Sequence, residues 1–331
     1  RLAGDRVSVL VTGGAGYVGA HACKALAEAG FQPVVYDDFS RGHRDFVRWG
    51  PAIEGDVRNA EALETAIRTH SAQAILHFAA KAEVAESLQA PALYFDVNIG
   101  GAVAIVQAAA ATDVRSLIFS STCAVYGAPG VSPIPESAPR QPINPYGFSK
   151  LAAERLFQDA ESAHGLRTIA LRYFNAAGAE PEATIGERHS PETHLIPLAI
   201  RAAMPGDFTL QIFGEDYPTP DGTPLRDYVH VADLAAAHVL ALRRLLGGGG
   251  SAAFNLGVGR GYSVKEIVAA AASVAGRPAR ARSAPRRAGD PPELVADASA
   301  VKAALGWRPA HADILDIVGD AYRWAMREAA A

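Results

Sequence analysis

The first strand-like run of the chain passes into a glycine-rich turn, and this junction restricts the fold more than any other feature. Residues 7–12 are short, apolar and rich in valine, as in a buried strand of a parallel sheet. Gly13, Gly16 and Gly19 follow at once, and residues 20–29 look helical. Glycines at such a turn let the backbone approach a pyrophosphate, to which the new helix offers its N-terminal amides. The spacing is G-x-x-G-x-x-G, and its place between strand and helix predicts a dinucleotide site.

An acidic pair ends the second strand-like run, residues 33–36. Asp37 and Asp38 stand where a dinucleotide site needs an acceptor for the adenosine ribose hydroxyls. A carboxylate there would repel a 2′-phosphate, so the sequence favours NAD over NADP. The nearby Arg41 keeps NADP open as an alternative.

Strand-like and helix-like runs alternate through the first half of the chain, as a doubly wound parallel sheet requires. We predict strands near residues 7–12, 33–36, 52–55, 74–78, 115–120 and 167–173, and helices near 16–29, 59–69, 92–111 and 145–164. Ligands of such sheets gather at the carboxyl ends of the strands. The site residues are therefore expected directly after the strands.

The composition changes after Tyr173. Residues 175–229 and 277–292 are rich in loop-forming residues, and between and after them we expect helices over 231–246, 263–275 and 314–325 and a strand over 253–257 that returns to the large sheet. The prediction is an α/β fold: a Rossmann-like doubly wound parallel sheet with a smaller, discontinuous α/β substrate domain. The NAD-binding domain would comprise residues 1–174 plus about 230–258, and the substrate domain 175–229 plus about 259–331.

Composition narrows the class of protein further. The 331 residues carry a net charge of −4, which offers no basic field to nucleic acid or to an acidic membrane. We find no signal-peptide pattern and no run of about 18 uncharged apolar residues. Cys23 and Cys123 lack metal-ligand spacing, and the histidines form no H-E-x-x-H motif, so no metal site is expected. Free thiols suit a reducing compartment, which predicts a cytoplasmic protein.

A tyrosine and a lysine are the candidates for proton chemistry. Tyr146 and Lys150 stand four apart on the helix predicted after Asn144, so both side chains lie on one face. A neighbouring ammonium favours the phenolate and lowers the pKa of a tyrosine. Alone, such a pair is usually a packed ring and a solvated stem. The glycine turn, and the hydroxyl run 120–122 that closes the fifth strand, favour the catalytic interpretation.

These features together resemble the extended short-chain dehydrogenase/reductase family. The motifs that carry the resemblance are the glycine turn, Ser120-Ser121-Thr122 and Tyr146-x-x-x-Lys150. Further motifs resemble its UDP-glucose 4-epimerase branch: Leu171-Arg172-Tyr173-Phe174-Asn175, Ile212-Phe213-Gly214-x-Asp216-Tyr217, Asp221-Gly222-Thr223, Arg226-Asp227-Tyr228-Val229-His230-Val231 and Arg286-Arg287-x-Gly289-Asp290. The similarity runs from about residue 7 to residue 325.

The resemblance implies a reaction in which Tyr146 takes the proton of a sugar 4-hydroxyl while the C4 hydride moves to bound NAD. Lys150 would hydrogen-bond the nicotinamide ribose and, with the positive nicotinamide, hold Tyr146 partly as phenolate; Thr122 would hydrogen-bond the reacting oxygen. Return of the hydride to the opposite face of the 4-keto sugar would interconvert UDP-glucose and UDP-galactose.

The resemblance and the glycine turn also imply the remaining contacts. Residues predicted to bind the cofactor are Gly13, Gly16, Tyr17, Val18, Gly19, Asp37, Asp38, Ser40, Arg41, Gly42, Asp56, Val57, Phe78, Ala79, Ala80, Asn98, Tyr146, Lys150 and Tyr173. Those predicted to bind the UDP-sugar are Thr122, Phe174, Asn175, His194, Leu195, Gln211, Phe213, Arg226, Arg287, Asp290 and Leu294. Arg226 and Arg287 suit the two phosphates, and Leu294 stands where side-chain size varies with the sugar.

Several alternatives stay open. Related dehydratases place acids beside the Ser/Thr, whereas Cys123 and Ala124 follow Thr122 here, so epimerisation is favoured over dehydration or net oxidation. The UDP-N-acetylglucosamine and UDP-xylose/UDP-arabinose pairs remain candidate substrates. An NAD-sensing protein without catalysis would not need Thr122, Tyr146 and Lys150 together. The resemblance further implies a homodimer formed through residues 92–111 and 145–164.

Overall fold

The main body of the protein is a seven-stranded sheet in the order β10-β6-β5-β4-β1-β2-β3, in which every neighbouring pair is parallel. The computed structural model describes residues 6–287 and 290–330. The strands are β1 (Ser8–Thr12), β2 (Gln32–Asp37), β3 (Ala52–Glu54), β4 (Ala74–His77), β5 (Ser116–Thr122), β6 (Arg167–Tyr173) and β10 (Ala252–Leu256). The predicted doubly wound sheet is confirmed, including the strand that returns to it from the second half of the chain.

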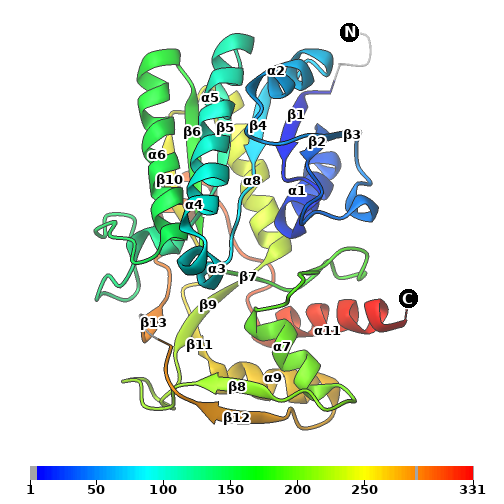
Figure 1. Ribbon diagram of the computed structural model, residues 1–331, viewed down its shortest axis with the longest axis vertical. Helices are drawn as coiled ribbons and strands as arrows, with labels where there is room; N and C mark the ends of the chain where they lie inside the picture. The colour runs from blue at the N-terminus through cyan, green and yellow to red at the C-terminus, as the bar shows by residue number, and fades with distance from the viewer. Residues whose placement is uncertain (1–5, 288–289, 331) are drawn as a thin grey trace.

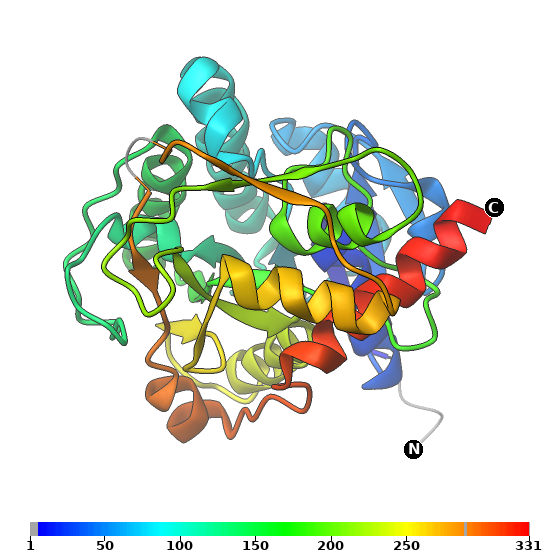
Figure 2. The same ribbon diagram turned by 90° about the horizontal axis from the view of Figure 1, so that it is seen from below.

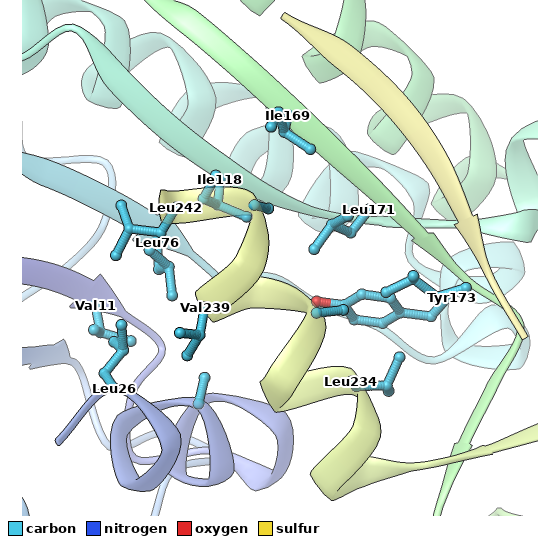
Figure 3. Packing of buried hydrophobic residues seen from close by; sticks show 14 of the residues in the cluster. Val11, Leu26, Leu76, Ile118, Ile169, Leu171, Tyr173, Leu234, Val239 and Leu242 are labelled. Atoms are coloured by element: carbon cyan, nitrogen blue, oxygen red, sulfur yellow. The ribbon is translucent and has the colours of Figure 1, made fainter. Parts of the chain in front are cut away.

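Helices cover both faces of this sheet (Figure 1). One face carries α1 (Tyr17–Glu28) and α8 (Val231–Leu246), and the other carries α2 (Ala60–Thr69), α5 (Gly100–Thr112) and α6 (Pro145–His164). On the first face, Val11 and Leu76 of the strands pack against Leu26 of α1 and Leu242 of α8 (Figure 3). The strands are apolar throughout because both of their faces are buried.

One helix is longer than the others of the sheet domain. The helix predicted over 92–111 consists of α4 (Pro91–Tyr94), a π-helical turn η2 (Phe95–Ile99) and α5, which together run from Pro91 to Thr112. By length and mean hydropathy (1.4) it could cross a membrane, the one such helix in the described part of the chain. Its Ala102, Ile105 and Ala109 are buried in the core beside the sheet, as in a core helix of a folded domain.

A smaller region lies at the carboxyl edge of the large sheet. Its four-stranded sheet contains β7 (Asn175–Ala177), β9 (Leu225–His230), β11 (Gly261–Ser263) and β13 (Glu293–Leu294), and β8 (Leu210–Phe213) pairs with β12 (Ala281–Ala284). The helices α7 (Leu195–Ala203), α9 (Val264–Ala275) and α11 (Ile314–Ala330) share one hydrophobic core (Figure 2). The helix predicted over 263–275 begins with a cap, because Ser263 and Glu266 form a reciprocal capping box.

The prediction of a loop over 277–292 was wrong for residues 281–284, which form β12. The segment 175–229, rich in loop-forming residues, contains β7, α7, β8 and β9. Residues 281–283 are exposed and show no alternation of apolar and polar side chains. Backbone hydrogen bonds to β8 define β12, and the sequence pattern therefore could not predict this strand. Two short helices, α3 (Val84–Gln89) and α10 (Ser299–Leu305), and the single turns η1 (Arg44–Phe46) and η3 (Cys123–Tyr126) were not predicted either.

The division into two domains stays a proposal, with one adjustment. Val301 of α10 and Trp307 are buried in the core cluster of the large sheet, although residues beyond 259 were assigned to the substrate domain. The Trp307 indole donates to the carbonyl of Asp233 on α8, and the Asp233 carboxylate accepts from the amides of Ala310 and His311. Residues 298–311 therefore pack with the first domain.

Candidate active site

The strand ends that carry the predicted site residues meet at one edge of the sheet. β1 and β4 are neighbours with Thr12 opposite His77, so the glycine turn lies beside residues 78–80, which follow β4. The strand order reverses between β1 and β4, and such a switch point opens a crevice where doubly wound folds bind ligands. Next to it, Thr122 ends β5 opposite Tyr173 of β6.

The glycine turn has the shape that a pyrophosphate requires. Gly13 has φ +73°, and a Cβ there would lie 2.5 Å from the amide nitrogen of Ala79. A Cβ on Gly19 would clash with the carbonyl oxygen of Gly13. Gly16 caps α1 without a side-chain hydrogen bond, which leaves the first-turn amides, those of Tyr17, Val18 and Gly19, without a side-chain acceptor. These residues therefore fit a dinucleotide, since donors and room for its phosphates are both present.

Gly13→Ala is expected to lower the NAD content of the purified protein at least about tenfold, because a left-handed alanine costs about 1–3 kcal/mol and its methyl pushes residues 78–79 into the crevice. The measurement is NAD released by acid from a weighed amount of protein. Gly30→Ala is the matched control: its φ is +90°, but a Cβ there meets nothing within 4 Å. Equal NAD loss in both variants would contradict the prediction.

The carboxylate of Asp37 is held beside the turn. It accepts from the amides of Ala15 (3.0 Å) and Phe39 (2.9 Å), and burial raises its pKa. Gly42 lies against it, because a Cβ on Gly42 would be 2.7 Å from its Oδ1. Asp38, in contrast, accepts from the amide of Ser40. Asp37 is thus the better placed of the two acids for a ribose.

Arg41 is occupied elsewhere. Its guanidinium lies 3.2 Å from the carboxylates of both Glu83 and Glu86, and it also donates to the carbonyl of Ser190. A guanidinium shared among three acceptors is poorly placed to hold a 2′-phosphate. This geometry favours NAD over NADP.

Two predicted cofactor contacts form hydrogen bonds or ion pairs within the protein. Both amide hydrogens of Asn98 are used within the protein: they go to Ser149 Oγ (2.9 Å) and to the carbonyl of Lys81 (3.0 Å). Asn98 thereby ties the loop after β4 to α6, one residue before Lys150. Asp56 is ion-paired with Arg58 on the surface.

Two more predicted cofactor contacts are largely covered by protein. Val57 is buried and would touch a Cβ on Gly101 of α5. The Tyr173 hydroxyl donates to Nε2 of His238, whose Nδ1 donates to a backbone carbonyl.

The catalytic candidates converge as predicted. α6 begins at Pro145, and its cap Asn144 accepts from the amide of Gly147 at 2.8 Å. Lys150 is 3% exposed and donates to the carbonyl of Ser120 at 2.8 Å. The Thr122 hydroxyl is close enough to Tyr146 to favour its phenolate form, and so to lower its pKa. The end of β5 and one face of α6 thus form a single hydroxyl–phenol–ammonium site.

Burial dominates the electrostatics of this site. It raises the pKa of Tyr146 to about 12 and lowers that of Lys150 to about 7, against the opposing effects of Thr122 and Glu154 respectively. The role predicted for Lys150, to hold Tyr146 partly as phenolate together with the positive nicotinamide, stays a prediction. Bound NAD would supply the additional positive charge, on its nicotinamide ring, together with the hydride acceptor.

Lys150→Met is expected to stabilise the cofactor-free protein below pH 7, by roughly one to a few kcal/mol. The folded-state pKa of about 7 lies below the value of about 10.4 in an unfolded chain, so the buried ammonium penalises the wild type fully below pH 7. As pH rises from 7 to about 10.4 the unfolded wild type binds more protons, so the wild type gains stability and the difference closes. Urea midpoints of both proteins across that range measure it; a difference independent of pH would contradict it.

A buried network behind the site was not predicted. Glu154 stands one turn beyond Lys150, and its carboxylate pairs bidentately with Arg172 at 2.9 and 2.7 Å. The same carboxylate accepts from Ser121 (2.5 Å), and Arg172 donates to the Tyr126 hydroxyl (2.8 Å). The regular four-residue spacing of 146, 150 and 154 could have indicated Glu154.

On the substrate side the fold brings several predicted residues together. Phe174 and Leu294 pack in one cluster with Cys123, directly beside Thr122. Arg226 forms an ion pair with Asp290. Phe174 and Leu294, two residues predicted to bind the sugar nucleotide, thus lie close to the end of β5.

The proposed uracil segments are less uniform. Arg287 stacks on Phe213 with its guanidinium carbon 4.0 Å from the ring centroid, whereas Gln211 is exposed on β8. Leu195 begins α7, and Asn175 begins β7. Gly289 of the arginine-rich motif lies outside the described residues.

The imidazole of His194 is ion-paired with two glutamates. It lies 2.7 Å from Glu187 and 3.0 Å from Glu192, which raise its pKa to about 10 against the effect of burial. It therefore carries a proton at neutral pH. The glycine-turn residue Tyr17 lies nearby and donates to the carbonyl of Gly178 at 2.6 Å.

Comparisons with known proteins agree with one another. Residues 9–257 match the model of the "NAD dependent epimerase/dehydratase family". The chain is 48% identical over 323 residues to a UDP-glucose 4-epimerase of Rhizobium leguminosarum bv. trifolii, covering 98% of each chain. A crystal structure of UDP-glucose 4-epimerase from Brucella ovis in complex with NAD is similar with a TM-score of 0.94 and 47% identity, covering 96% of this chain and 98% of that one. A third relative, from Stenotrophomonas maltophila with bound NAD and formylated UDP-arabinopyranose, has a TM-score of 0.93 and 39% identity, covering 98% and 100%.

Proposed function

Because the chain belongs to the NAD dependent epimerase/dehydratase family, we propose that it interconverts UDP-glucose and UDP-galactose by transient oxidation at the sugar C4. The observation that carries this proposal is the convergence of Thr122, Tyr146 and Lys150 at the carboxyl edge of the sheet, beside a glycine turn that fits a dinucleotide. Relatives named UDP-glucose 4-epimerase that match nearly the whole chain support the substrate.

Each catalytic residue has a distinct role in this proposal. The phenolate oxygen of Tyr146 would accept the proton of the 4-hydroxyl, and bound NAD would supply the hydride acceptor for C4, so that a 4-keto sugar results. Thr122 donates to the reacting oxygen and holds it near Tyr146. Lys150, fixed by the carbonyl of Ser120, favours the phenolate through its charge. After the sugar has rotated to present its other face, Tyr146 would return the proton to the oxygen at C4, and return of the hydride to that face would leave no net oxidation.

The substrate contacts follow from the same arrangement. Arg226 and Arg287 would hold the diphosphate, and Asp290 would release its ion pair with Arg226 to accept from the uridine ribose. Phe174 and Leu294 would line the sugar pocket beside Thr122. Asn175, Leu195, Gln211 and Phe213 are proposed to act as assigned from the sequence, whereas His194 is held by Glu187 and Glu192.

The direct test is to incubate the purified protein with UDP-galactose, without added nucleotide, and to identify the product. UDP-glucose as the sole product is the expected result. A 4-keto product would instead indicate a dehydratase, and steady accumulation of NADH once NAD is added would indicate a net oxidoreductase. The dehydratase alternative is disfavoured because burial raises the pKa of the Cys123 thiol to about 12, and Ala124 has no proton to offer.

A wider sugar range has one specific support. Leu294 is a mid-sized side chain, half-buried against the Cys123–Phe174 cluster, and one similar structure is of a UDP-Glc/GlcNAc 4-epimerase from Campylobacter jejuni (37% identity). Turnover of UDP-N-acetylgalactosamine, compared with that of UDP-galactose, tests this range. The UDP-xylose/UDP-arabinose pair is tested in the same assay.

We further propose that the protein is a homodimer joined through α5 and α6. Large apolar side chains are exposed along these helices and the segment before them: Phe148 (51%), Leu88 (61%), Val103 (39%) and Phe95 (38%). Phe95 and Phe148 stack edge to face with centroids 5.7 Å apart, across the gap between the two helical segments. A second copy presenting the same face would bury this surface.

Phe148→Glu is expected to convert the dimer into a monomer, because it places a charge at the centre of the apolar face. Light scattering should give about twice the chain mass for the wild type and a single chain mass for the variant. Leu246→Glu, at an exposed apolar position on α8 across the sheet, is the matched control and should stay dimeric. A monomeric wild type would contradict the proposal.

The cytoplasm is the proposed location. Cys23 and Cys123 are both free and buried, which suits a reducing compartment. Fractionation of cells that produce the protein tests this assignment.

A further inference from the structure

Four potential metal ligands meet in the segment between β7 and α7. Glu187, His189, Glu192 and His194 each offer one ligand atom, and these atoms all lie within 4.8 Å of one another. No metal site was expected from the sequence, because the histidines form no H-E-x-x-H motif. These four residues stand in the order E-x-H-x-x-E-x-H. The fold of this segment brings the four side chains together, although their spacing in the sequence does not indicate a metal site.

The separations between the imidazole nitrogens and the carboxylate oxygens are close to those between ligands of a tetrahedral ion. The Nδ1 atoms of His189 and His194 lie 3.1 and 2.7 Å from Glu187 Oε1, and 3.8 and 3.0 Å from the carboxylate oxygens of Glu192. Ligands at about 2.0–2.1 Å from a tetrahedral zinc ion lie about 3.3 Å from one another. Each of these four nitrogen–oxygen separations lies within tenths of an ångström of that value, with Glu192 contacting His189 through Oε2 and His194 through Oε1.

The charge of the cluster also favours a cation. The side chains of Glu187 and Glu192 are only 7% and 18% exposed, and in the described part of the chain no lysine or arginine forms an ion pair with either. Their only ion-pair partners there are the two imidazoles. A metal ion on each Nδ1 would replace the imidazole proton and neutralise both carboxylates.

The ligands are held by contacts of the kind that orient metal sites. Glu192 Oε1 accepts from the amides of Thr193 (2.7 Å) and His194 (2.8 Å), which leaves Oε2 to face His189. The carbonyl of Glu187 accepts from the indole of Trp324 on α11. Such second contacts fix the direction of the ligand atoms.

The segment also bridges the two halves of the molecule. Arg188, inside the cluster, pairs with Asp45 near the glycine turn at 3.1 Å and with Glu328 of α11 at 2.5 Å. The ring of His189 stands edge-on to Tyr17, the first residue of α1, with centroids 6.3 Å apart. An ion here would therefore fix the loop beside the cofactor end of the crevice.

A second cluster, His230, His311 and Asp320, is less suited to an ion. His230 Nδ1 accepts from the amide of Ala232, so its Nε2 carries the proton and donates to Asp320. Both ring nitrogens are thus already used. This cluster provides the comparison for the experiment.

We propose that Glu187, His189, Glu192 and His194 form a four-ligand structural zinc site. The ion would fix the segment before α7 beside the cofactor end of the crevice. Two histidines and two carboxylates are ligands that zinc accepts in a closed, tetrahedral site. The ion has no part in the proton or hydride transfers and binds independently of the proposed epimerase activity.

The test is zinc uptake by the full-length protein. Chelator-treated wild type, dialysed against micromolar zinc chloride and then against buffer, is expected to retain one zinc per chain by elemental analysis. His189→Gln/His194→Gln should weaken retention at least about 100-fold, since loss of even an outer contact costs 10–100-fold. His311→Gln, in the second cluster, should retain zinc like the wild type.

A second measurement needs no variant. Cobalt chloride added to the chelator-treated wild type is expected to give the intense visible absorption of tetrahedral cobalt, and zinc should abolish it. A wild type that retains no zinc, or retains as much in the folded double variant as without the substitutions, would overturn the proposal. The four side chains would then be an ion-pair network only.

Discussion

Tyr146→Phe is expected to lower the turnover of UDP-galactose by about 1,000-fold or more while NAD stays bound, because a positioned general base contributes about 10²–10⁴-fold. The substitution removes only the hydroxyl, and the ring keeps its edge-to-face contact with Tyr94. The glycine turn and Asp37, which fit the dinucleotide, are untouched. Initial rates at saturating substrate, with NAD content measured on the same sample, test both halves of the prediction.

Tyr322→Phe is the matched control for this variant. Tyr322 lies on α11, packed against the core of the smaller region and away from β5 and α6. The same loss of a hydroxyl there should leave the turnover unchanged. Normal turnover in Tyr146→Phe would remove Tyr146 as the base, and loss of NAD would show that the hydroxyl acts in binding instead.

The large sheet and the catalytic helix could be predicted because local signals and tertiary packing agree there. α6 runs from Pro145 to His164, as predicted, since Asn144 caps it, Pro145 suits its first turn and Gly165 ends it in the left-handed conformation. The buried strands are continuous apolar runs. Because parallel strands end at one edge, the order of the motifs alone placed the glycine turn, Thr122 and Tyr146 near each other.

The smaller region could not be predicted in the same way. β12 is exposed and β13 has two residues, so their hydrogen-bond partners, not their side chains, define them. The ion pair between Arg226 and Asp290 joins two separately predicted contacts that are distant in the chain. The raised pKa of Tyr146 depends on how completely the fold buries it, which a motif does not record.

Arg172→Met is expected to destabilise the protein by about 3–5 kcal/mol, because it leaves the carboxylate of Glu154 buried without its partner. The carboxylate is bound on one side by Arg172 and on the other by Ser121, and Arg140 reaches it only at 3.5 Å from the surface. The measurement is the free energy of unfolding in urea.

Glu154→Met/Arg172→Met is the informative companion: with both charges gone it should regain most of that loss, since apolar replacements of a buried ion pair are often neutral or stabilising. If the double variant is as unstable as the single one, the network stabilises the fold through its hydrogen bonds to Ser121 and Tyr126 rather than through charge pairing. Recovery of stability with impaired turnover would instead assign Glu154 to the positioning of Lys150, whose pKa it raises from one turn away.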